Sequence, residues 1–125
     1  MRLVVPLLAL ASLFAASPTS ARDAVRGEIP AAQAAQFIGR DATVCGVVAG
    51  SRFSEFAEGQ PTVLYIGGAF PRHQFSVRVW ARHREAIGED LAALTGKTVC
   101  ATGRIGTANN LPEISIRRAG DFAVR

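Results

Sequence analysis

Two cysteines in nearly identical settings constrain the fold of this chain most strongly. Cys45 ends the segment Thr43-Val44-Cys45, and Cys100 ends the segment Thr98-Val99-Cys100, 55 residues later. Catalytic dithiols and zinc knuckles keep their cysteines about two to four residues apart and bring further Cys or His ligands. This spacing therefore argues against a redox pair or a metal site and favours a structural link.

The N-terminal segment has the pattern of an export signal. Arg2 supplies a positive charge, an apolar run from Leu3 to Ala16 follows, and Thr19-Ser20-Ala21 offers small residues for cleavage. The run is shorter than the roughly 20 residues that a membrane-spanning helix needs. We therefore expect residues 1–21 to be a cleaved signal, with cleavage after Ala24 as the alternative, and the protein to be periplasmic or secreted.

Export changes how the cysteine pair is interpreted. An even pair of cysteines in an oxidising compartment forms a disulfide by default. We therefore predict a Cys45–Cys100 disulfide, and two buried free thiols are the alternative.

The remaining chain, residues 22–125, is long enough for one small domain. Once Arg2 is removed, 13 Lys and Arg residues face 10 Asp and Glu residues, so its net charge is +3. A nucleic-acid binder with a strong electrostatic footprint carries a larger and clustered excess. The charge thus permits an anionic partner without requiring one.

The hydrophobic pattern predicts a helix, three strands, a second helix and two strands. Apolar and polar residues alternate with the period of a strand in three central segments, most clearly from Gln74 to Trp80, whereas Ile87, Leu91 and Leu94 recur at helical spacing. The tail after Gly120 is expected to extend the last strand. The predicted elements are a helix over 29–39, strands near 43–49, 62–67 and 74–80, a helix over 82–94, and strands over 97–106 and 113–118.

This order of elements is that of the OB-fold, a five-stranded, partly open Greek-key barrel with a helix between its third and fourth strands. The segments 96–105 and 111–116, together with the Thr-Val-Cys-Gly of residues 43–46 and the Gln-Pro-Thr of residues 60–62, resemble those of exported bacterial OB-fold domains. Members of this family occur alone or beside secreted nuclease domains and are described as nucleic-acid binders. The resemblance covers nearly the whole of residues 22–125 and implies the fold more firmly than the activity.

In such a barrel the first and fourth strands are antiparallel neighbours. The alternation turns Cys100 outward with Thr98, Thr102 and Arg104, and the shared frame turns Cys45 outward too. We therefore expect the two cysteines to meet at a position where the strands lie closest.

OB-folds bind single strands on the outer surface of their second and third strands, between the loop after the first strand and the loop before the fifth. By alternation, this surface contains the only Tyr and the only Trp of the chain, beside an arginine. Aromatic rings that only pack are the alternative interpretation. The candidate ligand-binding residues are Tyr65, Ser76, Arg78 and Trp80 on the strands, Arg52, Phe53 and Phe56 in the first loop, Asn109 and Asn110 in the second, and Arg72 at the edge.

No catalytic or metal site is expected from the sequence. The serines lack a nucleophile-elbow motif, and the two histidines, His73 and His83, have no acidic or cysteine ligand at a suitable spacing. The small basic cluster of these histidines with Arg72, Arg82 and Arg84 is interpreted as a solvated turn. We expect neither a cofactor nor enzymatic activity.

The sequence thus predicts a noncatalytic, exported OB-fold module. Single-stranded DNA or RNA, or another polyanion, is the first candidate ligand, because aromatic and arginine side chains share the predicted surface. The alternative is an envelope protein-interaction or assembly module, in which the same face or a free strand edge holds a partner chain.

Overall fold

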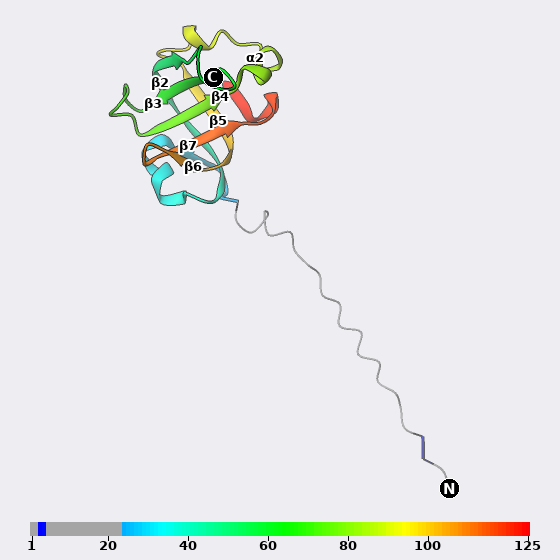
Figure 1. Cartoon of the computed structure of the whole chain (residues 1–125). Coiled ribbons are helices and arrows are strands. Elements are labelled where there is room, and N and C mark those ends of the chain that lie inside the picture. Colours follow the sequence, from blue (N-terminus) through cyan, green and yellow to red (C-terminus); the bar gives the residue numbers. More distant parts are fainter. Residues whose placement is uncertain (1–2, 5–23) are drawn as a thin grey trace.

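The computed structural model of this protein describes residues 3–4 and 24–125 (Figure 1). The predicted export signal lies outside the described residues except for Leu3 and Val4, and so does the cleavage position at Ala21. Within the described part of the chain, no helix is long and apolar enough to cross a membrane.

The chain folds into a β-barrel with OB-fold topology and short accessory helices, as predicted. The first three barrel strands form an antiparallel meander, the third pairs in parallel with the fifth, and the first pairs antiparallel with the fourth. The five barrel strands are β2 (Asp41–Phe53), β3 (Thr62–Ile66), β4 (Phe75–Val79), β5 (Thr98–Arg104) and β7 (Leu111–Ile116).

Three further short strands bring the total among the described residues to eight, which corrects the expected count of five. Strand β1 (Glu28–Pro30) pairs in parallel with β2, and β6 (Gly106–Ala108) pairs with β7. Strand β8 (Phe122–Val124) pairs with β5. The tail therefore does not extend the last strand, as the sequence suggested, but adds an edge on the other side of the barrel opening.

The helices are shorter than predicted. The first, η1 (Ala31–Phe37), is a 3-10 helix that begins after Ile29, which lies in β1. The expected second helix is divided into α2 (Ala81–Ile87) and a 3-10 turn, η2 (Leu91–Ala93). The division occurs at Gly88, which caps α2 in the left-handed conformation with φ of +73°.

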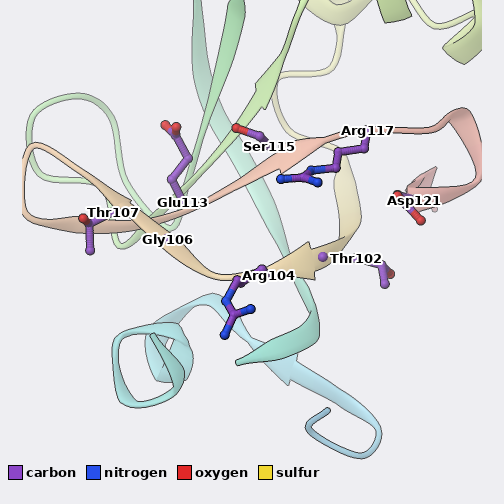
Figure 2. Close-up of a pocket in the computed structure, with 9 residues that line it drawn as sticks. Thr102, Arg104, Gly106, Thr107, Glu113, Ser115, Arg117 and Asp121 are labelled. Atoms are coloured by element: carbon purple, nitrogen blue, oxygen red, sulfur yellow. The ribbon is translucent and has the colours of Figure 1, made fainter. Parts of the chain in front are cut away.

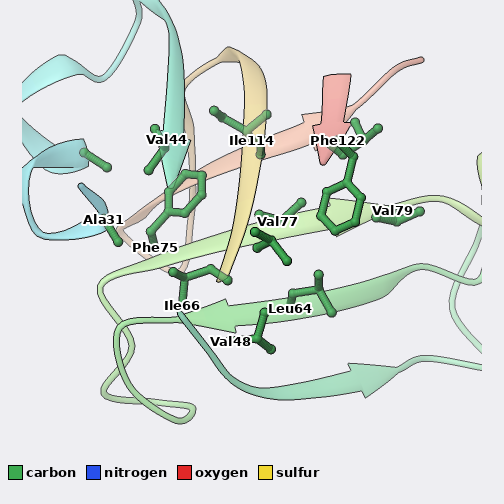
Figure 3. Close-up of a cluster of buried hydrophobic side chains, with 14 of the residues drawn as sticks. Ala31, Val44, Val48, Leu64, Ile66, Phe75, Val77, Val79, Ile114 and Phe122 are labelled. Carbon is green, nitrogen blue, oxygen red and sulfur yellow. The ribbon is translucent and has the colours of Figure 1, made fainter. Parts of the chain in front are cut away.

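The core lies inside the barrel and follows the alternation of the strands (Figure 3). In β4, Phe75, Val77 and Val79 point inward, as the pattern predicted, and are almost fully buried. Ala31 and Ala34 of η1 are buried in the same core. Gly46 of β2 belongs to the same tight packing, because a Cβ there would collide with Ile66.

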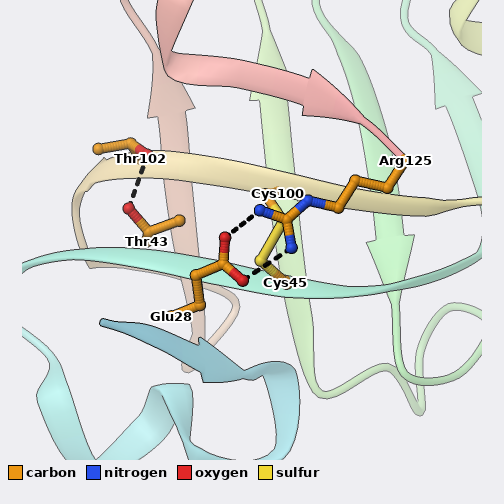
Figure 4. The surroundings of a disulfide bond; sticks show 6 residues. All are labelled: Glu28, Thr43, Cys45, Cys100, Thr102 and Arg125. Atoms are coloured by element: carbon orange, nitrogen blue, oxygen red, sulfur yellow. Dashed lines mark hydrogen bonds and ion pairs between the residues drawn. A yellow bond between two sulfur atoms is a disulfide. The ribbon is translucent and has the colours of Figure 1, made fainter. Parts of the chain in front are cut away.

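The predicted disulfide between Cys45 and Cys100 is present. The two residues face each other in the β2–β5 register, with 4.1 Å between their Cα atoms, and the next outer pair, Thr43 and Thr102, shares a hydrogen bond of 2.8 Å. An ion pair between Glu28 and Arg125 lies beside the sulfur atoms (Figure 4). The covalent bond thus clamps the two strands that close the barrel.

Candidate functional site

The outer surface of β3, β4 and β7, with the end of β2, carries four of the ten predicted ligand-binding residues: Arg52, Tyr65, Ser76 and Arg78. We call this surface the outer face. The strand register arranges it in two rows that run across the strands. One row consists of Arg52, Val63, Arg78 and Ser115, and the other of Gly50, Tyr65, Ser76 and Glu113.

A buried carboxylate that the sequence analysis did not assign lies at the centre of the outer face. The side chain of Arg78 donates from Nε to Oε1 of Glu113 at 2.8 Å, and Ser76 Oγ donates to Oε2 at 2.7 Å. Glu113 is only 8% exposed. Arg78 therefore has a charge partner inside the protein and offers a ligand less positive charge than the sequence suggested.

The sequence contained a signal for Glu113. The alternation in the last strand places Glu113 and Ser115 on one face and Ile114 and Ile116 on the other, and the third and fifth strands of an OB-fold are neighbours. Applying the same period-two argument to the fifth strand would have placed this carboxylate on the same outer surface as Ser76 and Arg78, although not in a particular register with them.

Tyr65 lies on the outer face, but other rings cover it. The ring centroid of His73 is 4.7 Å away and that of Phe70 is 5.4 Å away. Tyr65 is 9% exposed, whereas Phe70, which stacks on His73, is 49% exposed. The ring that this part of the protein presents to solvent is therefore Phe70.

Trp80 lies at the junction of β4 and α2, where it is half-buried. The guanidinium carbons of Arg78 and Arg82 are 5.5 Å and 5.8 Å from its ring centroid, distances at which a cation is attracted to an aromatic face. A Cβ on Gly59 would approach the indole to 2.7 Å, so glycine is required for this contact. Glu58, Gly59, Trp80 and Arg82 line a hollow of about 290 Å³.

Phe53 and the loop residues are less central than predicted. In the register, Phe53 pairs with Thr62 and lies at the open end of the barrel, where the Arg84 guanidinium covers its ring at 4.7 Å. Phe56 is exposed in the loop between β2 and β3. Asn109 and Asn110 are the two positive-φ residues of the tight turn that joins β6 to β7.

The predicted basic turn is divided between the surface and the interior. Arg72 is exposed in the loop between β3 and β4, while the neighbouring His73 is 6% exposed. Burial lowers the pKa of the His73 imidazole below its ordinary value of 6.5, although the nearby Glu113 carboxylate acts in the opposite direction. His73 is therefore a buried group next to the outer face and not part of a solvated turn.

A groove of about 270 Å³ continues the outer face across the gap between β7 and β5 (Figure 2). Arg117, just after β7, and Arg104, at the end of β5, both line it. The Arg104 side chain also donates to the carbonyl oxygen of Gly39 at 2.7 Å. The other lining residues are Thr102, Gly103, Gly106, Thr107, Glu113, Ser115 and Asp121.

Among the described residues, one group of three side chains brings possible metal-ligand atoms within 4.8 Å of one another: Glu28, Cys45 and Cys100. The two sulfur atoms are bonded to each other, and the carboxylate pairs with Arg125. A thiolate is the form of cysteine that binds metals, so the oxidised protein has no free thiolate to offer at this position.

Comparison with known proteins adds little to this geometry. No protein-family model matches the chain, and no curated protein is similar to it. The resemblance to exported bacterial OB-fold proteins therefore remains a prediction. Among solved structures, the crystal structure of yeast Stn1 and Ten1 is similar, with a TM-score of 0.49 and 16% identity over 68% of this chain and 42% of that chain.

Proposed function

We propose that this protein is a noncatalytic, exported binding module that holds single-stranded nucleic acid or a similar polyanion on its outer face. The observation that carries the proposal is the position of Trp80, a half-buried ring beside two guanidinium groups and next to an open hollow. Base stacking on such a ring is tolerant of sequence, and the arginines add phosphate contacts.

The arginines on and around the outer face support an anionic ligand. Arg52 and Arg78 share a row of the outer face, Arg82 follows Trp80 at the start of α2, and Arg117 leads from β7 into the groove. Glu113 offsets Arg78, and Glu58 lies on the wall of the Trp80 hollow. The net positive charge is thus moderate, and we expect weak, salt-sensitive binding.

The disulfide and the predicted export signal support a location in the periplasm or outside the cell, because disulfides persist in oxidising compartments. The buried polar groups at the centre of the outer face, Ser76, Arg78 and Glu113, bond to one another. This pairing is consistent with a binding surface and gives no sign of an activated nucleophile.

Fluorescence of the single tryptophan tests the proposal. When the oxidised protein is titrated with a single-stranded oligonucleotide, we expect saturable quenching of Trp80 that weakens as salt is raised. The Arg82→Gln variant keeps the fluorescent group and should bind several-fold more weakly, with a salt slope reduced by about one. Arg26→Gln, a change of the same charge before β1 and outside the outer face, should bind like the natural protein.

A parallel titration with heparin separates a general polyanion site from one for nucleic acid. Tight binding of both ligands supports the general form of the proposal. An unchanged fluorescence with every polyanion at low salt would contradict it and would favour a protein partner.

A further inference from the structure

A small polar hollow on the outer face is distinct from the Trp80 hollow and from the groove. Its volume is about 40 Å³, which is room for a few water molecules or for one functional group of a ligand. It lies between the aromatic stack of Tyr65 and His73 and the turn that contains Asn109. The residues that line it are Val63, Tyr65, His73, Ser76, Arg78, Ala108, Asn109 and Glu113.

His73, which lines this hollow, has an unused polar atom. Its Nδ1 atom is buried and has no hydrogen-bond partner among the described residues. Buried polar groups that lack a partner are uncommon and costly in folded proteins. The ring contacts with Tyr65 and Phe70 hold the imidazole in place, so Nδ1 stays without a partner among the described residues.

Glu113 supplies a second acceptor. Its two oxygen atoms already accept hydrogen bonds from Ser76 and Arg78, but an ionised carboxylate has about four acceptor positions. A neutral imidazole that carries its proton on Nε2 presents Nδ1 as an acceptor. Glu113 and His73 thus bring two acceptor groups to the lining of one hollow, and two acceptors match a group with two hydrogens, such as an amino group.

We propose that this hollow selects the exocyclic amino group of a base in the bound single strand. This inference rests on the proposed function and adds a base preference to it. The two amino hydrogens are donated to Glu113 and to Nδ1 of His73, the exposed ring of Phe70 stacks on the base, and Arg78 donates to the ring nitrogen beside the amino group. Cytosine has this edge, whereas thymine presents a carbonyl oxygen to the same two acceptors.

The test compares oligo(dC) and oligo(dT) of equal length, because these bases have rings of the same size. We expect the oxidised full-length protein to bind oligo(dC) about tenfold more tightly, as a site built to accept hydrogen bonds disfavours a ligand without the donor. Equal affinities, or tighter binding of oligo(dT), would overturn the inference.

The His73→Phe variant tests the contribution of His73 to the base preference without destabilising the fold. Phenylalanine keeps a ring between Tyr65 and Phe70 and removes the unpartnered nitrogen, so the variant should fold at least as stably. We expect it to lose most of the preference for oligo(dC) while its affinity for oligo(dT) changes by less than about twofold. A preference that survives in the folded variant would show that the hollow holds only water, and the inference would fail.

The two proposals fail in different ways. If both oligonucleotides bind with the same affinity and Arg82→Gln weakens both, the binding function stands and the base preference is wrong. If neither oligonucleotide binds, the proposed function itself is wrong, and the base preference is wrong with it.

Discussion

Replacing Cys45 and Cys100 together by alanine is expected to lower the free energy of unfolding by roughly 4 kcal/mol. The disulfide links positions separated by 55 residues, so it removes a large part of the conformational freedom of the unfolded chain. A domain of this size has a total stability on the order of 5–15 kcal/mol. The double variant should therefore be marginally stable.

Urea denaturation of the oxidised protein and of the double variant measures this loss. Reduction of the natural protein should reproduce it, and the same reductant should leave the unfolding of the double variant unchanged, which controls for other effects of the reagent. A difference of less than about 1 kcal/mol between the two proteins would contradict the assignment of the disulfide as the main clamp of the barrel.

Removal of the central carboxylate is expected to have the next largest effect. Glu113→Ala leaves the hydroxyl of Ser76 and the guanidinium of Arg78 without their acceptor. The serine is buried, while the Arg78 side chain is 25% exposed and can be partly hydrated. We therefore expect a loss of about 2–3 kcal/mol in the free energy of unfolding, less than for a fully buried ion pair.

Loss of the Glu113 charge should strengthen ligand binding, although loss of the side chain weakens the fold. Glu113→Gln keeps an acceptor for Ser76 but removes the negative charge beside Arg78, so affinity for oligo(dT) should rise several-fold at low salt. The control for the stability effect of Glu113→Ala is Glu89→Ala. It removes an exposed carboxylate away from the outer face and should change the free energy of unfolding by less than about 0.5 kcal/mol. Weaker binding by the folded Glu113→Gln variant would show that Arg78 needs its partner to contact the ligand.

The features that depend on strand period could be predicted from the sequence. The alternation from Phe75 to Val79 gives the inner and outer residues of β4. The repeated Thr-Val-Cys frame turns Cys45 and Cys100 to the same side of two strands that the OB-fold order makes antiparallel neighbours. Both predictions use one strand, or two strands with matching patterns, and both are confirmed.

The features that depend on contacts between distant segments were missed. Glu113 reaches Ser76 and Arg78 only because β7 pairs in parallel with β4. The alternation within either strand does not determine this pairing or its register. Tyr65 is covered because the loop that carries Phe70 and His73 folds back over it. Loops have no hydrophobic period, so the sequence pattern does not predict such a contact.

Local backbone effects account for the remaining differences. The periodic run after Arg82 predicts one helix, but Gly88 adopts a left-handed conformation that ends α2. Phe122 is buried against the barrel by β8, which pairs with β5. A short apolar tail gives no indication of which strand it will pair with.

The central claim is that the outer face holds a single strand, and backbone amide chemical shifts test it most directly. On addition of a single-stranded oligonucleotide to the oxidised protein, we predict shifts at Val63, Arg78 and Ser115 and at the indole of Trp80, with little change at Thr43 and Thr98 beside the disulfide. Shifts concentrated around the disulfide, or no shifts at low salt, would contradict this account.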